Sequence, residues 1–159
     1  DADDLLDPNY LEEQVKFIKD NGPIITAGYR RMAENTTTNF IPRESITYKQ
    51  LLTGNDCSCL TTMYDKEVVG DLYFPEDLQR HEDFIFWLDI LKKGYTVKGN
   101  PKVIATYRIL KVSKNSNKIK LLKPMHHVYH KVLKFNFVKS FWYLSKYVLY
   151  SKKKYKEVK

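Results

Sequence analysis

Short helical and strand-like segments alternate along the first two thirds of this chain of 159 residues. The clearest is 81–93, where large apolar side chains recur at the spacing of one helical face and Gly94 follows the last turn. These side chains are Phe84, Trp87, Leu88 and Leu91. Helices that alternate with strands predict a layered α/β domain, because each helix covers part of a sheet face.

The other predicted elements are shorter. Their boundaries rest on β-branched runs, on helical spacing of apolar residues and on Gly or Pro at the ends. We expect helices at 8–21, 46–52 and 65–69, a polar turn at 34–39, and strands at 24–29, 57–64, 95–97 and 103–109. With 43% hydrophobic residues, the chain can bury a substantial core. It contains no run of 18 apolar residues, so no conventional membrane-spanning helix is predicted.

The net charge of +8 is unevenly distributed. Residues 1–100 contain 11 basic and 18 acidic side chains, a balance of −7. Residues 101–159 contain 16 basic side chains and a single acid, Glu157, a balance of +15. We therefore divide the chain into an α/β part at 1–118 and a basic, aromatic, helical tail at 119–159.

The chain starts with a dense carboxylate cluster, Asp1-Ala2-Asp3-Asp4. Two carboxylates one residue apart, Asp1 and Asp3, can hold a hard divalent cation and leave sites open for a substrate diphosphate. The alternative is that Asp3 or Asp4 caps the following helix, because an Asp side chain accepts hydrogen bonds from the first free N–H groups.

Several further motifs follow this cluster in a definite order. They are Leu11-Glu12-Glu13-Gln14-Val15, Gly54-Asn55, the segment 58–63, Gly70-Asp71-Leu72-Tyr73-Phe74, His81-Glu82-Asp83 and Tyr107-Arg108. Together with the opening acids, this ordered set resembles family 2 glycosyltransferases, starting at their DXD motif. The resemblance covers about residues 1–118, and the order of the motifs is far more specific than any single one.

The resemblance implies the C-terminal half of a Rossmann-like GT-A domain. The other half, which would bind the base and ribose of a nucleotide-sugar, would precede residue 1. We therefore expect the 159 residues alone to be an inactive fragment.

The activity that the resemblance implies is transfer of a sugar, with inversion, from a nucleotide-sugar to a saccharide or lipid-linked acceptor in surface polysaccharide synthesis. The cofactor would be Mn²⁺ or Mg²⁺, held by Asp1 and Asp3. Such an ion neutralises the charge that builds on a departing diphosphate.

An acceptor hydroxyl must also lose its proton, and an acidic pair opens the helix at 81–93. The resemblance implies that Asp83 is the base and that Glu82 supports the site or binds acceptor. His81 could form a hydrogen bond in the site or cap the helix. The structural alternative for Glu82 and Asp83 is a pair of first-turn acids on a surface helix.

Three more residues are candidates for substrate binding. Trp87 lies one turn beyond Asp83 and is either a wall for an acceptor sugar or a core aromatic. Tyr107 and Arg108 end a predicted strand, where Arg suits bidentate phosphate binding, although a structural ion pair is an alternative. A His often follows this pair in the family, but Ile109 stands next here.

The tail combines aromatic stripes with lysines, which suits the surface of an anionic bilayer. We expect peripheral membrane contact through 119–159, on the cytoplasmic face of the membrane, whereas the alternative is packing onto the α/β part. A second function, in a different class, is a non-catalytic nucleic-acid-binding module. The net acidic first region and the absence of known nucleic-acid-binding motifs argue against it.

Overall fold

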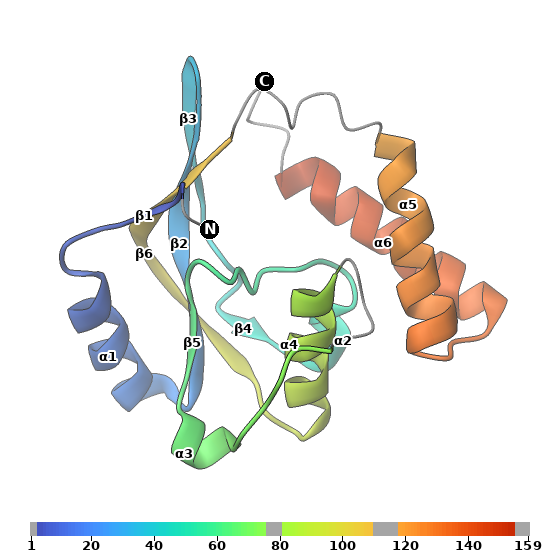
Figure 1. Cartoon of the computed structure of the whole chain (residues 1–159), viewed down its shortest axis with the longest axis horizontal. Coiled ribbons are helices and arrows are strands. Elements are labelled where there is room, and N and C mark those ends of the chain that lie inside the picture. The colour runs from blue at the N-terminus through green and yellow to red at the C-terminus, as the bar shows by residue number, and fades with distance from the viewer. Residues whose placement is uncertain (1–2, 76–80, 110–117, 155–159) are drawn as a thin grey trace.

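A computed structural model of the chain describes residues 3–75, 81–109 and 118–154 (Figure 1). Its centre is a six-stranded mixed sheet built around two long strands, β2 (Ile24–Ala33) and β6 (Val97–Arg108), which run parallel to each other. The sheet is therefore the α/β arrangement that the alternating sequence pattern predicts, consistent with a Rossmann-like GT-A half domain.

The short strands are all antiparallel to their long neighbours. β1 (Leu5–Leu6) and β4 (Ser45–Ile46) pair with β6, whereas β3 (Thr36–Phe40) and β5 (Thr62–Tyr64) pair with β2. The register Leu5 to Thr106 brings the N-terminal acids next to the end of β6. This pairing matters for the site, because residues 3–4 and residues 107–108 are far apart in sequence.

Helices cover both faces of the sheet, as Figure 1 shows. α1 (Tyr10–Asn21) lies on one face, where its buried Gln14 donates a hydrogen bond of 2.8 Å to the backbone oxygen of Thr61. α2 (Tyr48–Leu51) and α4 (Glu82–Lys92) lie on the other side, and α3 (Lys66–Val69) lies at the end of β5. α4 buries seven of its residues, so it is the central helix of the main core.

The basic tail forms α5 (Lys118–His127), a π-helical turn η2 (Val128–Val132) and α6 (Phe137–Lys154). These elements pack on the outer side of α4 (Figure 1). Tyr129 is fully buried, donates to the backbone oxygen of Leu52 at 2.6 Å and meets the ring of Phe84 edge to face. The tail therefore shares a hydrophobic core with the α/β part. No helix among the described residues is long and apolar enough to cross a bilayer.

Helices were predicted more accurately than strands. The helices at 65–69 and 81–93 are confirmed. The turn predicted at 34–39 lies between two strands as expected, but it is confined to 34–35, and residues 36–39 belong to β3. The strand predicted at 57–64 is reduced to β5, and the two strands predicted between 95 and 109 are one irregular strand, β6.

Candidate active site

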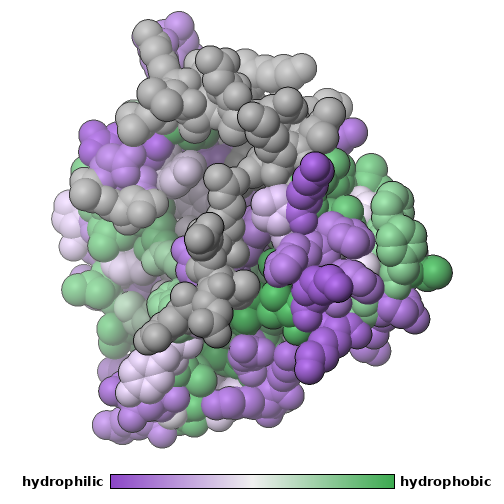
Figure 2. Space-filling view, turned by 45° about the vertical axis from the view of Figure 1, so that its right-hand side comes forward, coloured by the Kyte–Doolittle hydropathy of each residue, from purple (hydrophilic) through white to green (hydrophobic). Residues whose placement is uncertain are grey.

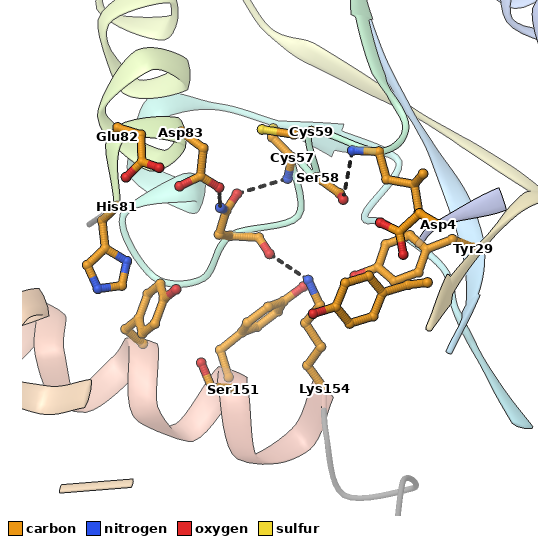
Figure 3. Close-up of a pocket in the computed structure, with 15 residues that line it drawn as sticks. Asp4, Tyr29, Cys57, Ser58, Cys59, His81, Glu82, Asp83, Ser151 and Lys154 are labelled. Carbon is orange, nitrogen blue, oxygen red and sulfur yellow. Dashed lines mark hydrogen bonds between the residues drawn. The ribbon is translucent and has the colours of Figure 1, made fainter. Parts of the chain in front are cut away.

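A cavity of about 470 Å³ lies between the end of β6, the start of α4 and the end of α6 (Figure 3). The side chains around it come from six separate parts of the chain. They are Asp4, Tyr29, Asn55, Cys57, Ser58, Cys59, Leu60, His81, Glu82, Asp83, Tyr107, Tyr147, Tyr150, Ser151 and Lys154. The cavity is thus built from the N-terminal acids, the acidic pair of α4 and the basic tail together.

One side of the cavity carries the N-terminal acids. The backbone N–H of Arg108 donates to the Asp4 carboxylate at 3.1 Å, and the Arg108 guanidinium donates to the backbone oxygen of Asp3. Asp4 and Tyr107 line the cavity, whereas Asp3 and Arg108 do not. Burial raises the pKa of Tyr107, and the Asp4 and Asp3 carboxylates raise it further. Asp1 lies outside the described residues.

The acidic pair opens α4 on another side of the cavity, beside His81 (Figure 3). His81 adopts the left-handed backbone conformation (φ 64°) and makes no side-chain cap to the helix. Its backbone oxygen instead accepts from the N–H of Ile85 at 3.1 Å, which starts the helix directly after it. This turn places both Glu82 and Asp83 at the cavity.

Asp83 is more enclosed than Glu82, which is exposed. The Asn55 side-chain amide donates to the Asp83 carboxylate at 3.4 Å. Burial raises the pKa of Asp83, although the backbone N–H of Phe84 partly opposes this by stabilising the ionised carboxylate. A carboxyl with a raised pKa is a stronger base, which favours proton abstraction from a hydroxyl at neutral pH.

The loop between α2 and β5 supplies a further part of the wall. Its buried Asp56 pairs with Arg43 at 2.7 Å, and Arg43 also donates to the backbone oxygen of Gly54 at 2.7 Å. The side-chain oxygen of Asn55 accepts from the N–H of Cys57 at 3.0 Å. These bonds fix the loop in a position where the amide of Asn55 donates to Asp83.

Trp87, one of the predicted substrate-binding residues, does not reach the cavity. It is 4% exposed and lies in the main core, against the rings of Tyr64 and Phe86. Its ring packs against Tyr64 of β5 and does not line the cavity. Of the two interpretations of Trp87, a wall for an acceptor sugar and a core aromatic, the structure agrees with the core aromatic.

Sequence reasoning did not identify the residues that α6 contributes to the cavity. These are Tyr147, Tyr150, Ser151 and Lys154, which are spaced as one face of a helix. The regular spacing was a signal, but a lysine-rich chain end is equally typical of a solvated helix. The tertiary contact with α4 was needed to assign a function to that face.

The arrangement can support displacement at a carbon that carries a diphosphate leaving group. The cavity combines a carboxyl that can take a proton, Asp83, with oxygen ligands on another wall, Asp4. Tyrosine rings and hydroxyls between them can contact a sugar. This combination of groups is that expected for a sugar-transferring enzyme.

Comparisons with known proteins agree with this class. The chain is 34% identical over 158 residues, 97% of its length, to a Bacillus subtilis protein that carries the name of a teichuronic acid biosynthesis glycosyltransferase, TuaG. It is 31% identical to an uncharacterized glycosyltransferase of Haemophilus influenzae, over 99% of the chain. It is 30% identical, over 98% of the chain, to WfgD of Escherichia coli, named as a UDP-Glc:α-D-GlcNAc-diphosphoundecaprenol β-1,3-glucosyltransferase.

The alignments cover 62%, 64% and 61% of these three relatives, so the chain spans somewhat less than two thirds of their length. No protein-family model matches it. The similarities, which extend over nearly the whole chain, support a relationship to glycosyltransferases.

Proposed function

We propose that this chain forms the acceptor side and the leaving-group side of a glycosyltransferase active site. The enzyme transfers a sugar from a nucleotide-sugar donor to a saccharide or lipid-linked acceptor in surface polysaccharide synthesis. The observation that carries this proposal is that Asp4 and Asp83, 79 positions apart in sequence, line one cavity. The names of TuaG and WfgD support the same class of reaction.

The proposed reaction is a single displacement with inversion. Asp83 accepts the proton of the acceptor hydroxyl as the oxygen attacks the anomeric carbon of the donor sugar. The bond from that carbon to the diphosphate breaks, and the nucleoside diphosphate leaves with the electron pair. Asn55 orients the Asp83 carboxylate through its amide, and Glu82, at the open rim, supports the acceptor.

The residues at the N-terminal wall fit a divalent cation. Hard cations such as Mg²⁺ and Mn²⁺ prefer oxygen ligands, and Asp4 presents a carboxylate to the cavity. Of the two ligands expected from the sequence, Asp3 does not line the cavity and Asp1 lies outside the described residues. No group of three or more potential ligands gathers within the part of the chain that the structure describes. One or two carboxylates are nevertheless sufficient for an ion that keeps waters and binds substrate phosphates. When bound, it would neutralise the departing diphosphate.

Removing divalent cations should abolish transfer. We expect excess EDTA to lower turnover of the complete protein by about 100-fold, a typical loss for a removed electrostatic stabiliser, and Mn²⁺ or Mg²⁺ to restore it. The measurement is release of nucleoside diphosphate from UDP- or dTDP-sugars. Full turnover in EDTA, with Asp3→Asn and Asp4→Asn equally active, would exclude the cation.

The acceptor side of the proposal includes a membrane surface, because α6 exposes a stripe of large apolar side chains. Its members are Phe137 (64% exposed), Val138 (77%), Phe141 (59%), Trp142 (52%) and Leu149 (62%). Lys139, Lys146 and Lys153 flank the stripe along the helix. Figure 2 shows hydrophobic and hydrophilic side chains side by side on the face turned toward the viewer.

We propose that this stripe lies in the interface of an anionic bilayer at the cytoplasmic face of the membrane, where a lipid-linked acceptor would be presented. Aromatic burial in the interface and attraction of each lysine to anionic headgroups, about 1 kcal/mol apiece, add to each other. The lysines favour an anionic lipid surface over a neutral apolar partner.

Replacing Phe141 and Trp142 together with Ala should weaken binding to vesicles of phosphatidylglycerol and phosphatidylcholine by about tenfold or more, since each ring contributes on the order of 1 kcal/mol. Flotation of the vesicles measures the bound fraction. The matched control is Leu11→Ala, which removes an equally exposed side chain (63%) from α1. Equal binding by both variants, or tight RNA binding without vesicle binding, would contradict membrane contact.

A further inference from the structure

The end of α6 forms one complete wall of the cavity, and it is anchored there by specific contacts. The Tyr150 hydroxyl donates to the buried Asp56 carboxylate, and the Arg43 guanidinium lies 4.8 Å from the centre of the Tyr150 ring. A side chain at Gly54 would collide with this ring, since a Cβ there would lie 2.1 Å from it. Gly54 therefore permits the close approach of α6 to the loop between α2 and β5.

Lys154 is the cation that this wall brings to the cavity. Its ammonium donates to the backbone oxygen of Asn55 at 2.8 Å and lies 3.9 Å from the centre of the Phe40 ring and 5.9 Å from that of Tyr29. Burial lowers the pKa of Lys154 to about 8, although the Asp56 carboxylate opposes this effect. An enclosed ammonium is costly unless an anion compensates for it.

The position of Lys154 indicates which part of the substrate it would contact. Lys154 lies close to Tyr29, and the centres of the Tyr29 and Tyr107 rings are 6.3 Å apart. Tyr107 belongs to the N-terminal wall, where the Asp4 carboxylate contributes to its raised pKa. In Figure 3, Asp4, Tyr29 and Lys154 lie toward one side of the view and His81, Glu82 and Asp83 toward the other. Lys154 therefore faces the leaving-group side of the cavity.

We propose that Lys154 is a donor-binding residue that contacts the diphosphate of the nucleotide-sugar, so that α6 completes the active site. This inference rests on the proposed function. Among the described residues at the cavity, the other formally charged side chains are the carboxylates Asp4, Glu82 and Asp83, which repel a diphosphate. A lysine on the same side as Asp4 supplies a fixed positive charge there, and it stays with the enzyme as the nucleoside diphosphate departs.

The test compares Lys154→Gln with Lys154→Arg and with Lys152→Gln, whose lysine is exposed on the same helix. Binding of UDP and uridine, and of dTDP and thymidine, to the complete protein is measured by calorimetry. We expect Lys154→Gln to weaken diphosphate binding by roughly 10- to 100-fold, the loss typical of a charged hydrogen bond, and to leave nucleoside binding unchanged. Lys154→Arg should recover most of the affinity, and Lys152→Gln should match the unmodified protein.

The nucleoside measurement separates a contact from structural damage. If α6 merely detaches from the cavity, Lys154→Gln weakens nucleoside and diphosphate binding together or changes neither, and the proposal is overturned. If the unmodified protein binds UDP or dTDP and transfers sugar while Lys154→Gln binds the diphosphate normally, only this inference fails. Absence of any nucleotide binding and transfer by the unmodified protein would overturn both this inference and the proposed function.

Discussion

Asp83→Asn should lower the turnover number of sugar transfer by about 10²- to 10⁴-fold, the usual contribution of a general base. The amide keeps the shape of the carboxyl and can still accept the hydrogen bond from Asn55, so the cavity should remain intact. Donor binding should change less than about threefold, because the acceptor hydroxyl and not the nucleotide meets Asp83. Single-turnover transfer and calorimetric binding of UDP measure the two effects separately.

The matched control is Asp89→Asn, on the same helix. Asp89 is exposed, pairs with Lys92 at 3.2 Å and lies outside the cavity, so its replacement should leave turnover within about twofold of the unmodified protein. Retained turnover in Asp83→Asn would exclude Asp83 as the base. Glu82→Gln then becomes the informative variant, because Glu82 is the neighbouring acid at the cavity.

Asp83→Asn should also stabilise the fold at neutral pH. Burial raises the pKa of Asp83 in the folded protein, so the ionised carboxylate destabilises the fold at any pH above that value. Below the unfolded-state pKa of about 3.9, Asp83 is protonated and neutral in both the folded and the unfolded protein. The stability gained by the variant should therefore be absent in acid and grow as the pH rises through the folded-state pKa. Urea unfolding between pH 3 and pH 7 would measure the gain; equal curves at pH 7 would contradict it.

Trp87→Ala should cost about 3–5 kcal/mol of unfolding free energy, the largest loss of stability expected here. Trp87 is almost fully buried and packs on Tyr64 and Phe86, so truncation leaves a cavity at the centre of the core. Its ring N–H is buried with no hydrogen-bond partner among the described residues. Trp87→Phe should therefore cost less than Trp87→Ala, because it removes the unpaired donor and keeps an aromatic ring.

The second tryptophan of the chain provides the control. Trp142 is 52% exposed on α6, and Trp142→Ala should change the unfolding free energy by less than about 1 kcal/mol. Urea unfolding followed by circular dichroism compares the two variants. If Trp87→Ala lowers stability no more than Trp142→Ala but raises the KM of the acceptor, Trp87 contacts substrate in solution.

Local patterns predicted the helices well but misjudged some strands. The apolar spacing of 81–93 identifies α4 because a helical face repeats within one segment. The segment 34–39 contains three threonines and two asparagines, and its strand β3 forms because β2 offers a pairing edge. Strand formation depends on the neighbouring strand, so local sequence is a weaker guide to it.

The tail had two open interpretations, packing onto the α/β part and contact with a membrane. One face of α6 packs on the α/β part, and the other carries the exposed apolar stripe for which membrane contact is our proposal. Leu144 and the buried Ser140 face the core, together with Tyr143 and Tyr147, whereas Phe141 belongs to the exposed stripe. The core-facing apolar residues and the exposed apolar residues both recur at helical spacing within the same 18 residues of α6. Which apolar face meets protein could not be read from their spacing alone.

The amino-acid sequence alone was enough for the alternating α/β plan, the acidic pair at the start of α4 and the reversal of charge near residue 101, because each depends on neighbouring residues. The resemblance implied that the N-terminal acids and Asp83 act on one substrate, and the structure places Asp4 and Asp83 at one cavity. The sequence did not reveal that Lys154 also lines this cavity, nor that Trp87 turns into the core. Those relations arise from the pairing of β1 with β6 and the packing of α6 against α4. Contacts between distant segments depend on how whole elements pack, and no short stretch of sequence contains that information.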